Sequence, residues 1–180
     1  KLSAQYALSV LKAPAQVGVV GAAAMTAGQR YAQRLMTYAP NVGDQAWHAF
    51  SGAFVGGDYI TFNRCRFNHN GNTGMNGRRR GHRILNCETS YNNHRNWASE
   101  WHAGGVKFIP YCQDWVVAGH VAASNNGDGI WFDSSMSGVT IEGCRSFRNR
   151  GHGIHYEIGS RGIIKNNLVY ENAMRGIYLS

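Results

Sequence analysis

The sequence has no long apolar run, few prolines and few acidic residues. No stretch of 18 apolar residues occurs, which excludes an ordinary membrane-spanning helix. No Cys-x-x-Cys pair occurs among the 4 cysteines, which argues against a structural zinc site. Proline accounts for only 3 of 180 residues while glycine accounts for 23, and asparagine is frequent from residue 63 onward. Glycine and asparagine both tolerate left-handed backbone, so many tight, regular turns are expected.

The shortage of acidic residues leaves the chain strongly basic. Ten Asp and Glu face 18 Lys and Arg, for a formal net charge of +8. Such a balance favours anionic partners, namely nucleic acid, anionic lipid or acidic polysaccharide. The densest basic run, "RRRGHR" at residues 78–83, has no interleaved aromatic residue, and no nucleic-acid-binding motif occurs. We therefore expect no nucleic-acid partner.

Asparagines recur at a spacing that aligns most of the chain with itself. They are Asn41, Asn70, Asn92, Asn125, Asn149 and Asn172. An apolar column follows each by five residues: Ala46, Met75, Trp97, Ile130, Ile154 and Ile177. A second column precedes the last five asparagines by eight residues: Phe62, Ile84, Val117, Ile141 and Ile164. Most intervals lie between 22 and 24 residues, which is the length of one coil of a parallel β-helix.

The main alternative at this period is the leucine-rich repeat, but its leucine frame is missing. The register predicts an all-β chain, a single-stranded parallel β-helix of about five to six coils over residues 41–180. Residues 1–40 stay outside the register and predict a short helical cap. Asparagines at one turn position are expected to stack as a hydrogen-bonded ladder. The last coil has no visible cap, which would allow oligomerisation there.

This pattern resembles the right-handed parallel β-helix superfamily, which includes pectate lyases, polygalacturonases, alginate-active enzymes and phage tailspikes. The resemblance implies a right-handed coil and a protein that is secreted or on the cell surface. "GHGIHYE", at residues 151–157, also looks like the Gly-His-Gly segment of polygalacturonases, which would give His152 a catalytic role. The Asn-Thr-Asp and Arg-Ile-Lys motifs of that family are absent, and no catalytic family is assigned.

Three cysteines share a turn position of the repeat and predict a stacked column of buried thiols. They are Cys65, Cys87 and Cys144, and neighbouring coils would also bring Cys65 and Cys87 close enough for a disulfide. Free thiols are the favoured alternative. Cys112 lies off this column.

"GDGIWFD" and "GHGIHYE" align as the same strand on successive coils. Alternation then points Trp131, His155, Asp133 and Glu157 outward. The same alignment adds two aromatic residues to this outward stripe, Tyr178 and Trp47. Aromatic faces stack on sugar rings, so Trp131, Tyr178 and Trp47 are candidate substrate-binding residues; packing of Trp131 under a neighbouring loop is the alternative.

Asp133 and Glu157 should lie one coil apart, with Cα atoms about 5 Å from each other. Such a pair could serve as acid and nucleophile in a retaining glycosidase. It could instead bind Ca²⁺, the only cofactor that the sequence suggests, or form a solvated acidic step.

The interval from Asn92 to Asn125 is 33 residues and holds an insertion near residues 97–112. Insertions in regular folds tend to carry function, and this one supplies two further candidate binding residues, Trp101 and Glu100. If "GVKFI" is the sheet strand, Lys107 falls beside Trp131; if "WASE" is, Glu100 joins the acidic column.

Three functions remain open. A hydrolase would use Asp133 and Glu157. A lyase acting on a uronate polymer such as pectin or alginate would use Lys107 or His155 as the base, with Arg or Ca²⁺ neutralising the carboxylate. The third is a non-catalytic carbohydrate-binding or adhesive solenoid, such as an oligomeric fibre or spike.

Overall fold

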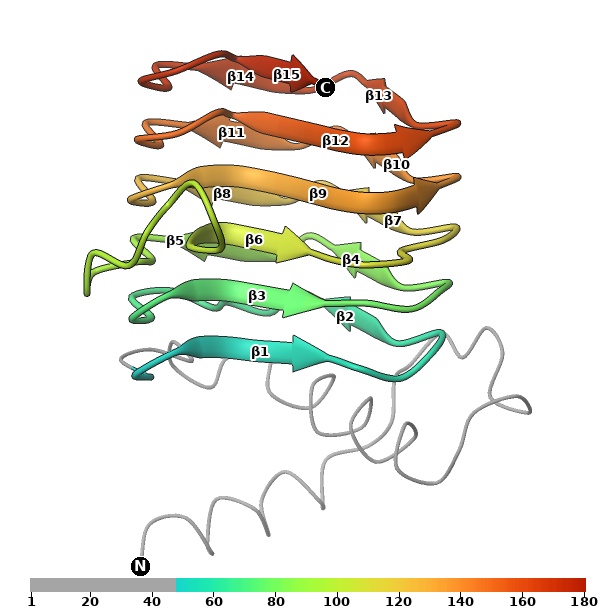
Figure 1. Cartoon of the computed structure of the whole chain (residues 1–180), viewed down its shortest axis with the longest axis horizontal. Helices are drawn as coiled ribbons and strands as arrows, with labels where there is room; N and C mark the ends of the chain where they lie inside the picture. The colour runs from blue at the N-terminus through green and yellow to red at the C-terminus, as the bar shows by residue number, and fades with distance from the viewer. Residues whose placement is uncertain (1–47) are drawn as a thin grey trace, which may run out of the picture.

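The computed structural model describes residues 48–180, which form a stack of parallel β-coils (Figure 1). The expected cap over residues 1–40, Asn41, Ala46 and Trp47 lie outside the described residues. Between residues 48 and 180 there is no helix long and apolar enough to cross a membrane.

Successive coils contribute strands to three parallel sheets. The largest sheet has six strands in the order β1-β3-β6-β9-β12-β15. These strands are β1 (Ser51–Val55), β3 (Thr73–Gly77), β6 (Gly104–Phe108), β9 (Asp128–Ser137), β12 (Ile154–Ser160) and β15 (Ile177–Leu179).

The other two sheets use three-residue strands. A five-stranded sheet contains β2 (Thr61–Asn63), β4 (Arg83–Leu85), β7 (Val116–Ala118), β10 (Thr140–Glu142) and β13 (Ile163–Lys165). A four-stranded sheet contains β5 (Glu88–Ser90), β8 (Val121–Ala123), β11 (Arg145–Phe147) and β14 (Leu168–Tyr170). The all-β solenoid expected from the repeat is therefore confirmed.

Equivalent positions of successive coils lie side by side, as the apolar columns predict. In the five-stranded sheet, Phe62, Ile84, Val117, Ile141 and Ile164 are direct neighbours. In the largest sheet Ile130 lies beside Ile154, which lies beside Ile177. The first two of these isoleucines are fully buried, whereas Ile177 on the last coil is 47% exposed.

The first apolar column was predicted wrongly at two places. Val106, not Trp97, occupies the column between Met75 and Ile130. The reason is the insertion: Val106 follows Asn92 by 14 positions, where Ile130 follows Asn125 by five. On the first coil, Ala53 rather than Ala46 lies beside Met75.

The asparagine ladder is present and buried. Asn125 is typical: its backbone N–H and its Nδ2 both donate to Asn149 Oδ1, at 3.1 and 2.9 Å. The same pair of bonds joins Asn70 to Asn92, Asn92 to Asn125, and Asn149 to Asn172. Each side chain thereby satisfies buried groups of the neighbouring coil, which fixes the vertical register.

A glycine column runs beside this ladder for a steric reason. A Cβ at Gly129 would lie 2.7 Å from both Asn149 Nδ2 and Gly153 O, too close for any side chain. Gly153 has the same relation to Asn172 and Gly176. The recurring glycine therefore allows the ladder to lie directly against the largest sheet.

The four cysteines are free and buried, which confirms the favoured alternative for Cys65, Cys87 and Cys144. Burial raises the pKa of the Cys144 thiol to about 11, so it stays protonated and behaves as a small apolar group.

Candidate active site

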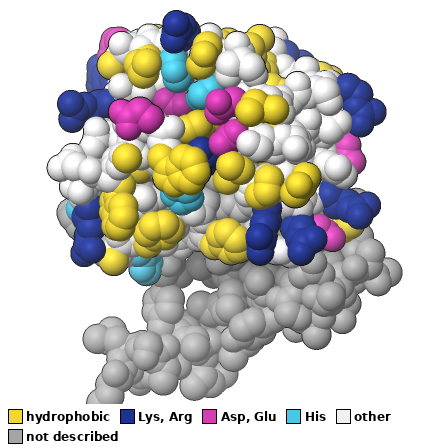
Figure 2. Space-filling view, in the orientation of Figure 1, with side chains coloured by type: hydrophobic (Ala, Val, Ile, Leu, Met, Phe, Trp, Pro, Cys, Tyr) yellow, Lys and Arg dark blue, Asp and Glu magenta, His cyan; other side chains and the backbone are white. Residues whose placement is uncertain are grey.

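The outward face of the largest sheet carries one continuous column of side chains in exact register across its coils. In strand order they are Phe54, Asn76, Lys107, Trp131, His155 and Tyr178. The expected placement of Lys107 beside Trp131 is confirmed. Figure 2 shows His and acidic side chains gathered above a patch of hydrophobic side chains on this side of the molecule.

A pocket of about 340 Å³ opens on this face between β9, β12 and the insertion. Asp128, Trp131 and Glu157 line it from the strands, Arg150 and His152 from the turn before β12, and Glu100 from the insertion. A larger pocket of about 580 Å³ lies at the last coil around Tyr156 and Arg161, and it is not lined by Asp128, His152 or His155. The 340 Å³ pocket is the candidate site because the polar side chains converge on it.

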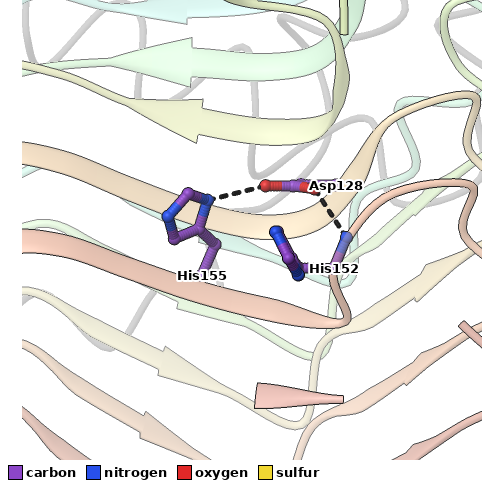
Figure 3. Close-up of side chains that lie close together, drawn as sticks. All are labelled: Asp128, His152 and His155. Carbon is purple, nitrogen blue, oxygen red and sulfur yellow. Dashed lines mark hydrogen bonds and ion pairs between the residues drawn. The ribbon is translucent and has the colours of Figure 1, made fainter. Parts of the chain in front are cut away.

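Asp128 joins two histidines of the next coil (Figure 3). Its Oδ1 accepts a hydrogen bond from the backbone N–H of His152 at 2.6 Å, and its Oδ2 lies 2.8 Å from His155 Nδ1. All three residues are buried. Gly151 permits this approach, because a Cβ there would collide with Asp128 Oδ1.

The hydrogen bonds assign opposite tautomers to the two imidazoles. A carboxylate only accepts, so His155 Nδ1 carries a proton, and in the neutral imidazole Nε2 then holds the lone pair. His152 Nδ1 accepts the backbone N–H of Arg175 at 3.2 Å, so its proton is on Nε2. Burial lowers the pKa of His152, opposed by the charge of Asp128, which favours this neutral form near pH 7. The pocket thus holds one imidazole able to accept a proton and one able to donate a hydrogen bond.

Lys107 is buried beneath the insertion and fully engaged. Its Nζ lies 2.9 Å from Asp133 Oδ2, donates to Trp101 O at 2.5 Å, and sits 3.3 Å from the centroid of the Trp131 ring. Burial lowers the pKa of Lys107, while Asp133 opposes that shift. Lys107 thus ties the insertion to the sheet.

The same packing corrects the expected exposure of Trp131. Its side chain points outward, but the residue is only 5% exposed because Lys107 covers one part and His155 stacks on it at 4.9 Å between centroids. An outward position in the strand does not give an exposed ring here. The alternative reading, in which this tryptophan packs beside the insertion, agrees with the structure.

Asp133 and Glu157 are direct neighbours on adjacent strands, as the alignment predicts. Their carboxylates, however, have different partners. Asp133 accepts from Ser134 Oγ at 2.8 Å besides its ion pair with Lys107, whereas Glu157 accepts from Trp131 Nε1 at 3.0 Å and lies 3.7 Å from His155 Nε2. Of the two, only Glu157 lines the pocket.

The remaining candidate residues lie in the insertion or on the last strand of the largest sheet. Glu100 lines it directly, and Trp101, in the same insertion, is 76% exposed. Tyr178 lies above His155 with ring centroids 4.8 Å apart. Trp47 lies outside the described residues, and Phe54 holds the corresponding place on β1.

One atom each from Asp128, His152 and His155 lie within 4.8 Å of one another, which is a spacing that could hold a metal ion. Ca²⁺ suits this donor set poorly, because it prefers six or more oxygen ligands and two of these donors are imidazoles. The two imidazoles and one carboxylate are donor types that suit a transition metal better. Hydrogen bonds already hold the three residues: Asp128 accepts from the His152 backbone N–H and pairs with His155 Nδ1, and His152 Nδ1 accepts the Arg175 N–H.

Sequence reasoning missed Asp128 and Arg150. A signal for Asp128 was available: it and His152 occupy the same repeat position, each just before a glycine of the buried column. Arg150 lies in a turn, where the repeat specifies backbone and leaves side-chain direction open.

Comparison with known proteins agrees with this architecture. Residues 46–180 match the family described as "Right handed beta helix region". No curated protein matches the chain. Among solved structures, the chain is similar to the crystal structure of pectate lyase Pel9A, with 24% identity and a TM-score of 0.52. The alignment covers 68% of this chain and 35% of that lyase, so the chain spans about a third of its length, and the likeness is one of fold. With three quarters of its length matched by the family model, the chain belongs to the right-handed β-helix family.

Proposed function

We propose that this protein cleaves an acidic polysaccharide by β-elimination at the pocket between β9, β12 and the insertion. The observation that carries the proposal is the Asp128–His155 pair, which directs an imidazole lone pair into a pocket also lined by Arg150. An oriented histidine is an effective general base near neutral pH.

In the proposed reaction, His155 Nε2 takes the proton from the carbon next to the uronate carboxylate. The C–H electron pair becomes the new C=C bond, and the glycosidic C–O bond at the adjacent carbon breaks with its electrons going to oxygen. Arg150 would pair with the carboxylate as its negative charge increases. His152 Nε2–H would donate a hydrogen bond to the leaving oxygen, which takes its proton from water.

Two other assignments of the base or nucleophile are less well supported by the contacts. Lys107 has its ammonium group held by Asp133, Trp101 and Trp131, and it is 3% exposed. The glycosidase pair requires both Asp133 and Glu157 to face one sugar ring, yet Asp133 is paired with Lys107 and does not line the pocket.

The charge of the chain supports an acidic polymer as the substrate. The net charge is +8, and Arg150 supplies a positive charge in the pocket, beside the carboxylates of Glu100, Asp128 and Glu157. The similar solved structure is titled a pectate lyase, which is consistent with a uronate substrate. A polymer of this kind is found outside cells, so we infer that the protein acts at the cell surface or after secretion.

The test is turnover of polygalacturonate and alginate, followed by ultraviolet absorption of the unsaturated product and by reducing ends. The wild type should generate both signals together. His155→Ala should lose at least about 100-fold in rate. His69→Ala changes a histidine that stacks on Tyr91 and does not line the pocket; it is the matched histidine control and should retain activity. If reducing ends form without ultraviolet-absorbing product, the reaction is hydrolysis and the elimination mechanism is rejected.

A second candidate function is glycan binding without cleavage. Trp101 at 76% and Trp97 at 49% exposure favour it, because large exposed aromatic rings commonly mark a binding surface. Tight binding of the polymers with no product from any of them would establish this function and reject the lyase.

A further inference from the structure

The insertion before β6 exposes aromatic rings that its own packing leaves uncovered. Trp101 is 76% exposed, and Trp97 and Phe50 are each 49% exposed. Phe50 meets the Trp97 ring edge-on at 5.9 Å and stacks on His102 at 5.6 Å. We call Phe50, Trp97 and Trp101 the aromatic platform. Exposing three such rings together is costly in water, which indicates that they bind something.

The backbone beneath the platform is fixed although its rings are exposed. The Asn93 side chain accepts from Trp97 N–H at 2.7 Å and donates to Trp97 O at 2.9 Å. Lys107 holds Trp101 O, and His102 Nδ1 lies 2.7 Å from Asn72 Oδ1. The insertion is therefore preorganised, and a ligand that stacks on it has little loop ordering to overcome.

The platform is continuous with the pocket. Ser99 and Glu100, between the two tryptophans, line the pocket that contains His155. Trp101 lies over Lys107 of β6, and His155 lies two strands further along the sheet. At about 4.8 Å per strand, this separation is roughly 10 Å, which a few linked sugar rings can span.

We propose that the aromatic platform binds the same polysaccharide chain as the pocket, a few sugar units away from the bond that is cleaved, with the apolar face of a sugar ring stacked on Trp101. The proposal rests on the proposed function in one respect: the occupant is the substrate of the pocket. The polymer thus runs along the solenoid axis, across the strands, and long chains bind more tightly than short ones.

The test compares Trp101→Ala with Tyr91→Ala, which removes an aromatic ring of 52% exposure from the turn after β5. Both changes are made in the His155→Ala background, so that binding is measured without cleavage. Affinity for polygalacturonate and alginate is measured by electrophoresis in polymer-containing gels, and affinity for a uronate dimer, too short to reach from the pocket to Trp101, by calorimetry. Trp101→Ala should weaken polymer binding roughly 2- to 10-fold and leave dimer binding unchanged, while Tyr91→Ala changes neither.

Several outcomes would overturn the proposal. Equal polymer affinity with and without Trp101 would do so, as would the absence of polymer binding in the His155→Ala background. A Trp101→Ala change in sedimentation with unaltered glycan affinity would show that the platform faces another copy of the chain. The lyase proposal can fail on its own. If the wild type forms no product but polymer binding depends on Trp101, the binding role of the aromatic platform is kept and the elimination reaction is rejected.

Discussion

The asparagine ladder predicts a large and local loss of stability on Asn125→Ala. Asn125 is 1% exposed, and its Oδ1 accepts from the Asn92 backbone N–H at 2.9 Å and from Asn92 Nδ2 at 3.0 Å. Truncation leaves both donors buried without that acceptor. At about 1–3 kcal/mol for each stranded group, the free energy of unfolding should fall by roughly 2–6 kcal/mol. This is a large share of the ~5–15 kcal/mol that holds a typical domain together.

The matched control is Asn126→Ala, one residue further along the same turn. Asn126 is partly exposed; it donates to the exposed Asn96 Oδ1 at 2.8 Å and makes a longer bond of 3.3 Å to Asn93 O. It should cost no more than about 1 kcal/mol. Urea unfolding followed by far-ultraviolet circular dichroism measures both variants. Equal losses for the two would refute the reasoning that the buried ladder fixes the register between coils.

Three further predictions concern buried charges and protons. Asp128→Asn should reduce turnover at least about 100-fold with little change in melting temperature. The reason is that the new amide donates to His155 Nδ1, which moves the imidazole proton to Nε2. Unchanged turnover would contradict the assigned tautomer. Burial lowers the pKa of His120 to about 4 from its ordinary 6.5. Between these two pH values the unfolded chain binds more protons than the folded chain. About 3 kcal/mol of the free energy of unfolding should therefore be lost as the pH falls from 6.5 to 4. His120 follows Val117 by three positions, as Cys87 follows Ile84 and Cys144 follows Ile141 on the neighbouring coils. His120→Cys should therefore make urea-unfolding stability less dependent on pH over that range, and an unchanged pH dependence would show that other groups cause it. Lys107→Met should cost about 3–5 kcal/mol in urea unfolding by leaving Asp133 buried without its partner, and adding Asp133→Asn should restore part of it; no restoration would argue against an essential ion pair.

The repeat predicted the fold well because each repeated position contacts the same position of the next coil. Ile130, Ile154 and Ile177 align since each must pack on the one before it, and any slip would place polar residues in the core. The register failed at Trp97, where the insertion separates Asn92 from the next strand. A repeat carries no information about where extra residues are accommodated.

The site was only partly predictable for a related reason. Alternation correctly places His155, Glu157 and Lys107 on the outward face, but it cannot tell which outward side chains a loop covers. Trp131 is buried because Lys107 reaches over it, a contact between two long side chains that no spacing rule specifies. The expected roles of Asp133 and Glu157, and an oligomer formed through the last coil, stay predictions for activity assays and sedimentation.

The most direct test of the central claim is turnover of uronate polymers by the wild type and by His155→Ala, measured side by side as ultraviolet-absorbing product. The account predicts product from the wild type on at least one such polymer and a loss of at least about 100-fold in the variant, with the fold intact by circular dichroism. Product formed equally well by a folded His155→Ala protein would contradict it.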